Sequence, residues 1–388
     1  MIIHAIAHAL KVTGSMTWEI LWALILGFIL SAIIQAVVRR KTVVKYLGDD
    51  KPRALIVAIG FGVASSSCSY AAVALARSLW RKGASFTNAM VFEIASTNLV
   101  IELGIILALL ITWQFTLAEF IGGPLMIIFV AILFRLFLRK RLLEDAHRQA
   151  EKGILGSMEG HAEMDMTINS SGTFRARLGS KEGLTSISHI FVMEWAAVIK
   201  DIVGGLLIAG TVSAWVPNIF WQRFFLTNHP LLSKIWGPLI GPLVSVVSFV
   251  CSIGNVPLAA VLWHGGISFG GVISFIFADL IIIPILLIYR KYYGIKMMLF
   301  ILSIFYVAMV ISGYLIEIIF SFLHLIPAER MTRISQTSIS WNYTTFLNII
   351  FILLAGILLY RFINSGGLGM LKMMNKTSNM NDGHIHEC

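Results

Sequence analysis

The chain has 388 residues, of which 57% are hydrophobic and only 13% are charged. Soluble globular domains carry about 25% charged residues, so this composition excludes an ordinary soluble protein and indicates an integral membrane protein. The formal net charge of +10 would suggest an anionic partner for a soluble protein. In a membrane protein it first reports which loops face the cytoplasm. We therefore expect the lipid bilayer as a partner and no interaction with nucleic acid.

Apolar runs of about 20 residues recur along the chain. They predict transmembrane α-helices, because a helix satisfies its own backbone hydrogen bonds in lipid. In chain order, the expected segments are 17–38, 54–80, 84–113, 117–138, 190–216, 237–263, 267–289, 297–326 and 341–363. The expected fold class is all-α, a polytopic transmembrane helical protein.

Two polar stretches divide the chain. Residues 139–189 are rich in Arg, Lys, Glu, Gly and Ser and separate two hydrophobic halves, and residues 364–388 follow the last apolar segment. We expect a first transmembrane repeat over 1–138, a cytoplasmic hydrophilic loop over 139–189, a second transmembrane repeat over 190–363 and a cytoplasmic polar tail over 364–388.

The two halves are related by sequence. Residues 68–95 align with residues 251–278 at a constant offset of 183, with 12 identities in 28 gapless positions. Leu, Val and Ala matches are expected from composition, but Cys68/Cys251 and Trp80/Trp263 are rarer residues in the same register. Internal repeats in a polytopic helical protein are typical of transporters.

The basic residues predict that one segment in each half does not cross the membrane. If 39–53 and 139–189 both face the cytoplasm, an even number of crossings lies between them, yet three apolar segments do. Segment 54–80 is the best candidate for a re-entrant hairpin, because its run FGVASSSCS favours a break between two short helices.

The corresponding hairpin in the second half is 237–263, where Gly254, Asn255 and Pro257 in SFVCSIGNVP disfavour a continuous helix. With both hairpins re-entrant, three crossings separate equivalent helices, so the two repeats are inverted. Inverted repeats with broken helices place a binding site near the membrane midplane. If both hairpins instead span fully, the repeats are parallel and residues 139–189 lie outside.

Three sequence features resemble one bacterial family. They are SSSCSYAAVALARSLWRKGASFTNAMVFEIASTNLV, its second copy SFVCSIGNVPLAAVLWHGGISFGGVISFIFADL, and the loop sequence EGHAEMDM. Together they resemble the predicted-permease family that includes the trivalent organoarsenical efflux permeases. The resemblance covers about 40–138 and 190–326. It implies a permease that works by efflux, with a thiophilic solute as one candidate substrate.

Two cysteines are the strongest candidates for contact with such a solute. Thiolates are preferred ligands of thiophilic metals, and Cys68 and Cys251 lie at equivalent breaks of the two hairpins. Packing as small hydrophobic residues is the alternative. The expected substrate-binding residues are those of the two breaks: Ser66, Ser67, Cys68, Ser69, Cys251, Ser252 and Asn255.

Ionisable residues inside a membrane segment are costly and usually functional. Glu93 and Asp279 lie in apolar segments, with the polar Asn98 in the interruption EIASTNLVIE, and Asp279 aligns with Ser96. We expect Glu93, Asn98 and Asp279 to couple transport to a proton. A static ion pair of Glu93 with Arg77 is the alternative.

Three further residues are expected at the membrane edges. Trp80 and Trp263 are expected to anchor the hairpin ends at opposite interfaces, and Glu317 is expected to be interfacial.

The tail offers a candidate metal site, because the chain ends in DGHIHEC with His384, His386 and Cys388. A disordered tail is the alternative, and a cluster of His, Glu, Met and Asp over 161–166 is a weaker candidate. No cofactor and no enzymatic activity are expected, since HExxH, CxxC and phosphate-loop motifs are absent from the sequence.

We expect a multi-pass permease of the inner (cytoplasmic) membrane that moves a small molecule or ion. A membrane thiol-redox or thiol-transfer protein using Cys68 and Cys251 is the alternative function. A homodimer is compatible with the sequence, which does not decide the oligomeric state.

Overall fold

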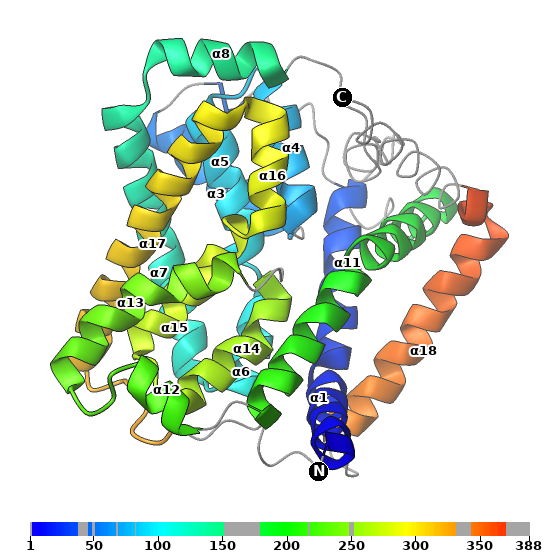
Figure 1. The fold of residues 1–388 in the computed structure, drawn as a ribbon. Helices are drawn as coiled ribbons and strands as arrows, with labels where there is room; N and C mark the ends of the chain where they lie inside the picture. Colours follow the sequence, from blue (N-terminus) through cyan, green and yellow to red (C-terminus); the bar gives the residue numbers. More distant parts are fainter. Residues whose placement is uncertain are drawn as a thin grey trace, which may run out of the picture.

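A computed structural model describes residues 2–37, 46–48, 51–66, 69–81, 83–150, 179–215, 218–247, 252–330 and 343–369. All secondary structure within these ranges is helical, as the composition predicts (Figure 1). The predicted residues Ser67, Cys68, Cys251, His384, His386 and Cys388, and the cluster over 161–166, lie outside the described residues.

Several described helices are long and apolar enough to cross a membrane. By length and composition four qualify alone, and one bent pair makes a fifth. The four are α5 and α6 taken together (Phe86–Asn98, Ile101–Leu110), α7 (Trp113–Phe137), α17 (Ile295–Phe322) and α18 (Tyr343–Asn364). The protein is therefore a multi-pass membrane protein.

The first hairpin consists of α3 (Pro52–Ser65) and α4 (Ser69–Arg81). Helix α3 ends because Ser66 adopts a left-handed conformation, with φ of 40°, while its backbone N–H still donates to Gly62 O. Short polar residues compete for backbone hydrogen bonds and so favour such an ending. The predicted break within segment 54–80 is confirmed.

The second hairpin consists of α13 (Pro230–Val246) and α14 (Ser252–Gly265), so α13 ends before the predicted run SFVCSIGNVP and α14 begins inside it. Gly254, Asn255 and Pro257 lie inside α14 and not in the break. Pro257 lies in the second turn of α14, where it cannot donate a backbone hydrogen bond to the carbonyl of Ile253. Asn255 Nδ2 donates to Ser245 Oγ at 3.1 Å, which ties α14 back to α13.

Each hairpin begins and ends at the same end of the molecule. Leu47, just before α3, accepts hydrogen bonds at its carbonyl from Ser85 N (2.9 Å), just after α4. Pro230, the first residue of α13, and Gly266, which follows α14, line one cavity. Helix α4 lies in the upper half of the molecule and α14 in the lower half (Figure 1). The two hairpins therefore approach each other from opposite ends.

The turn that follows each hairpin has the same geometry at aligned residues. Gly83 and Gly266 have φ of 102° and 110°, a region that favours glycine. Ser85 and Ser268 are the N-caps of the next helices, and each accepts a hydrogen bond from the backbone N–H three residues on, at 3.1 and 3.2 Å. Residues 183 positions apart at these turns thus share their local backbone structure as well as their residue type.

The helix after each turn is also interrupted. Helix α5 ends at Asn98 and α6 starts at Ile101, as the polar interruption predicts. In the second half α15 (Phe269–Ile276) continues as η1 (Phe277–Leu280), and the chain then bends by 41° into α16 (Ile283–Tyr293). These interruptions place Asn98 and Asp279 at helix ends in the interior.

Three helices pack together at one side of the molecule, where α11 also contacts α14 and α1 contacts α6 (Figure 1). Helix α1 (Ile2–Val37) packs against α11 (Lys181–Trp215) and α18. Both α1 and α11 start well before the predicted segments 17–38 and 190–216, so α11 begins inside the predicted hydrophilic loop. Their crossing of the membrane stays a prediction.

The ends of the two hairpins are covered differently. Helix α8 (Lys140–Ala150) lies across the end of α4, where the Trp80 and His147 rings are 5.0 Å apart (Figure 1). Trp80 and Trp263 are both buried, so the prediction that they face the membrane interface is wrong. The reason is that protein covers each ring: α8 covers Trp80, and Arg330 lies 4.3 Å over Trp263.

We predict that residues 180 and 329 lie on opposite sides of the membrane. If the α13–α14 hairpin does not cross, three crossings separate these residues. Cysteine introduced at Ser180 or at Glu329, with the native cysteines replaced by serine, should react with an impermeant maleimide from opposite faces. Labelling of both from the same face would contradict a re-entrant hairpin.

Candidate functional site

The two hairpin breaks meet at a buried carboxylate. Ser69 Oγ and Ser252 Oγ each donate to Asp279 Oδ2, both at 2.7 Å, and the two hydroxyl oxygens are 3.1 Å apart. All three side chains are buried. Ser69 and Ser252 are separated by the repeat offset of 183, so equivalent residues of the two halves contact one carboxylate. We call Ser69, Ser252 and Asp279 the central triad.

The triad also joins two helix N-termini. Ser69 is the first residue of α4 and Ser252 the first residue of α14. The first N–H groups of a helix lack intrahelical partners, and the helix dipole places partial positive charge there. A carboxylate is therefore stabilised between two N-termini, and the same position suits an anionic or electron-rich group of a ligand.

The hydroxyl groups of the triad have limited donor capacity. A serine hydroxyl carries one proton and two lone pairs. Because both hydroxyl protons are directed to Asp279, the two serine oxygens can offer only lone pairs to any other group. The hydroxyl pair can therefore accept from a donor or contact an electron-poor centre.

Asn98 is the fourth predicted residue that the fold brings to this site. Its Nδ2 is 3.5 Å from Asp279 Oδ1, at the limit of a hydrogen bond, and its Oδ1 has no partner among the described residues. Ser96, which aligns with Asp279, instead donates to the carbonyl of Glu93 within its own helix. The amide of Asn98 thus has an unused acceptor next to the triad.

Glu93 is buried and accepts a hydrogen bond from the Tyr289 hydroxyl, while its Oε2 has no partner among the described residues. Arg77, the predicted alternative partner, lies 4.4 Å over the Tyr292 ring and donates to the carbonyl of Ala150. Glu93 is close enough to Asp279 for the two charges to interact. The described contact of Glu93 is therefore with a tyrosine.

Sequence reasoning missed Glu119. It is fully buried in α7, and neither carboxylate oxygen has a hydrogen-bond partner within the described ranges. It also interacts electrostatically with Asp279. The sequence could have indicated Glu119, because it is the single glutamate of the apolar segment 117–138 and a charge in such a segment is costly and usually functional.

Two other predicted residues have different partners. Ser66 donates to Glu102, a first-turn residue of α6, and Asn255 donates to Ser245. Both contacts stabilise a hairpin break without reaching Asp279 in the described structure. The fold thus brings together Ser69, Ser252, Asn98 and Asp279 of the predicted set.

A resident metal is not indicated by the part of the chain that the structure describes. Within it, no group of three or more His, Cys, Asp or Glu side chains could hold a metal ion. The predicted tail ligands lie outside those ranges, so their role stays a prediction.

Comparisons with known proteins point to a membrane transporter. A protein-family model described as "Predicted permease" matches residues 5–318. The chain is 65% identical over 373 residues to a Mycobacterium tuberculosis protein named "Putative permease Rv2963", over 96% of this chain and 92% of that protein. No solved structure gives a significant match. These descriptions favour a transporter over an enzyme and give no support to the thiol-redox alternative.

We predict that the two triad serines act as one unit. Ser69→Ala and Ser252→Ala each remove a hydrogen bond to a buried carboxylate and should each lower the free energy of unfolding by about 1–2 kcal/mol. Because the hydroxyls share one acceptor oxygen, the double variant should differ from the sum by at least about 0.5 kcal/mol. Chemical unfolding in mixed micelles measures these values.

Ser303→Ala is the matched control for the triad variants. The Ser303 hydroxyl is exposed and donates only to the carbonyl of Leu299 in its own helix. Its removal should change the free energy of unfolding by less than about 0.5 kcal/mol. Strict additivity of the triad variants would contradict a shared acceptor.

Proposed function

The chain belongs to the predicted-permease family, and from this premise we propose that it is a secondary transporter of the inner (cytoplasmic) membrane that exports a small solute by alternating access. The observation that carries the proposal is the central triad. It joins Ser69 and Ser252, the equivalent residues at which α4 and α14 begin after the two hairpin breaks, to one carboxylate. Broken helices in a membrane are tolerated where they line a cavity or a binding site.

The proposed architecture is a pair of inverted repeats with re-entrant hairpins. Its support is that each hairpin starts and ends at one end of the molecule, and that α4 and α14 meet at their N-termini. In transporters built this way, half-helix ends surround the substrate near the midplane. Alternating access then exposes this midpoint to one side at a time.

The proposed substrate is a small thiophilic metal, metalloid or sulfur-containing solute. Cys68 and Cys251 directly precede Ser69 and Ser252 in the sequence, so the chain brings both cysteines to the segments that end at the triad. Thiolates prefer soft centres. The lone pairs of the two serine hydroxyls supply a second, harder set of contacts.

Proton coupling is proposed for the carboxyl groups around the triad. Asp279, Glu93 and Glu119 are buried and interact electrostatically, and their described contacts include no cationic side chain. A proton on Asp279 would remove the charge that the two helix N-termini now stabilise. The serine hydroxyls and N-termini would then be available to the solute.

Everted membrane vesicles test the proposed function. Methylarsenite, arsenite, Cu(I), Zn(II) and an organic thiol should be screened for uptake, which corresponds to export from the cell. We expect at least one thiophilic solute to accumulate without ATP, and accumulation to collapse with an uncoupler. Uptake that survives the uncoupler, or that none of the panel shows, would contradict the proposal.

For the accepted solute, Cys68→Ser and Cys251→Ser should each abolish most flux. The double variant should be little worse than either single one, because the two thiolates act at one site. Normal flux in both single variants at normal expression would remove the thiolate ligands from the proposal.

We predict that replacing a coupling carboxyl abolishes pH-driven transport but leaves solute exchange intact. Glu93→Gln keeps the shape of the side chain but cannot titrate, so it should lose pH-driven accumulation and retain solute counterflow. Glu119→Gln tests the third carboxyl in the same way. Glu144→Gln, on the exposed part of α8, is the control and should retain both activities. Wild-type accumulation in Glu93→Gln would end its assignment to coupling.

A further inference from the structure

A cavity lies away from the central triad, at the end of the second hairpin. Its volume is about 510 Å³, within the range of small-ligand sites. It is bounded by the start of α13, the turn between α14 and α15, the end of α17 and the segment that leads to Arg330. Helix α14 is 14 residues long, so the cavity is about 20 Å from the triad.

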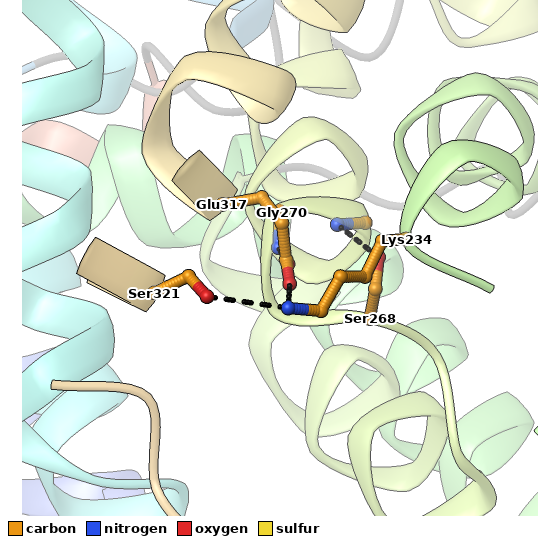
Figure 2. Close-up of polar contacts among 6 residues, drawn as sticks. Lys234, Ser268, Gly270, Glu317 and Ser321 are labelled. Carbon is orange, nitrogen blue, oxygen red and sulfur yellow. Dashed lines mark hydrogen bonds and ion pairs between the residues drawn. The ribbon is translucent and has the colours of Figure 1, made fainter. Parts of the chain in front are cut away.

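One side of the cavity carries a shared carboxylate. Glu317 Oε2 accepts from Gly270 N at 2.7 Å, and Glu317 Oε1 is 3.7 Å from Lys234 Nζ (Figure 2). Glu317 is buried, whereas it was expected to be interfacial, because α15 begins beside it and supplies this N–H. The Lys234 side chain is 44% exposed against 6% for Glu317, and its ammonium also donates to Ser321 Oγ at 3.2 Å.

The other side of the cavity carries Arg330. Its guanidinium lies over the Trp263 ring and donates to the carbonyls of Trp263 (3.1 Å) and Ile267 (2.6 Å). Burial lowers the pKa of Arg330 from its ordinary value, and the charge of Glu317 opposes that shift. An anion near this guanidinium would replace the lost hydration.

The charges lining the cavity do not cancel. Lys234 and Arg330 bring two positive charges, and Glu317 brings one negative charge whose two oxygens already have partners. His324 is the remaining titratable side chain of the lining. The cavity therefore favours an anionic group.

Two exposed apolar residues directly follow lining residues of the cavity in the sequence. Leu231, in the first turn of α13, is 80% exposed, and Phe322, at the end of α17, is 82% exposed. Leu231 follows Pro230 and Phe322 follows Ser321, and both Pro230 and Ser321 line the cavity. In a membrane protein such side chains face the acyl chains of lipid. A ligand that combines an anionic head with an apolar body matches both the charged lining and these exposed apolar neighbours.

The turn after α4, in the first hairpin, has the same backbone geometry as the turn after α14 but is covered by a helix. The geometry of the turn therefore does not by itself produce the cavity. At the equivalent turn of the first half, α8 fills the corresponding end, with His147 against Trp80 and the carbonyl of Ala150 accepting from Arg77. The equivalent position beside the first turn is thus covered by α8, whereas a cavity adjoins the second turn.

We propose that this cavity binds the phosphate head group of an anionic phospholipid, with the phosphate between Lys234 and Arg330 and the acyl chains over Leu231 and Phe322. Basic recesses between transmembrane helices are suited to such head groups. The proposal does not depend on the transport activity and is tested by binding alone.

Native mass spectrometry of the full-length protein in detergent tests the proposal with phosphatidylglycerol and phosphatidylcholine of the same acyl chains. The first phosphatidylglycerol should bind more tightly than phosphatidylcholine. Lys234→Gln should weaken that first binding by about five-fold, the usual effect of one basic residue near a lipid head group. Lys234→Arg keeps the charge and should restore it.

Lys296→Gln is the matched control. Lys296 is an exposed lysine at the opposite end of the same helix as Ser321, about 38 Å away along α17. It should leave the first binding constant within two-fold of wild type. Equal loss in Lys234→Gln and Lys296→Gln, or no loss in Lys234→Gln, would overturn the assignment of the cavity.

A soluble phosphate ester distinguishes the source of the phosphate. Glycerol 1-phosphate has the charge of the head group without acyl chains, so it should not displace the lipid at millimolar concentration. Full displacement would overturn the lipid assignment and identify the cavity as a site for a soluble anion. If Lys234→Gln unfolds at a lower temperature than wild type, the wild-type comparison of the two lipids decides in its place, and equal affinity for phosphatidylglycerol and phosphatidylcholine would overturn the proposal.

Discussion

Two hydroxyl groups that share one carboxylate oxygen hold the breaks of the two hairpins together. A broken helix inside a membrane leaves backbone N–H groups without partners, and two N-termini facing each other concentrate positive charge. Asp279 balances that charge and accepts from Ser69 and Ser252. The interruption of the following helix at η1 is what places Asp279 in this position. The hairpin breaks, the central triad and the bend between η1 and α16 therefore all depend on the balance between the Asp279 charge and the two helix N-termini.

The buried carboxyl groups differ in how well the surrounding structure compensates them. Placing a charged aspartate at the centre of a membrane helix costs about 2.5–3.5 kcal/mol on insertion scales. Asp279 has two hydroxyl donors, Glu93 and Glu102 have one hydroxyl each, and Glu119 has no hydrogen-bond partner among the described residues. The least compensated group gains most from neutralisation.

Much of this arrangement could be predicted from the sequence, because local rules govern it. The serine-rich break after α3 and the polar interruption after α5 were both predicted from residue type. The second break was predicted too long, because Gly254 and Pro257 were assigned to it but lie inside α14, which begins at Ser252. Pairings over more than 180 residues, such as Tyr289 with Glu93, have no local signal. The covering of Trp80 by α8 depends on tertiary packing in the same way.

The repeated turn gives this protein an internal reference for the energetics of its own backbone. Gly83 and Gly266 share one conformation, so a side chain at either position meets the same torsional strain. Their surroundings differ: a Cβ at Gly83 would have no neighbour within 4 Å, whereas one at Gly266 would lie 2.5 Å from Thr227 Cγ2. The difference between equivalent alanine substitutions in one chain therefore isolates crowding from torsion. Few proteins that lack a duplicated architecture permit that separation without comparing different molecules.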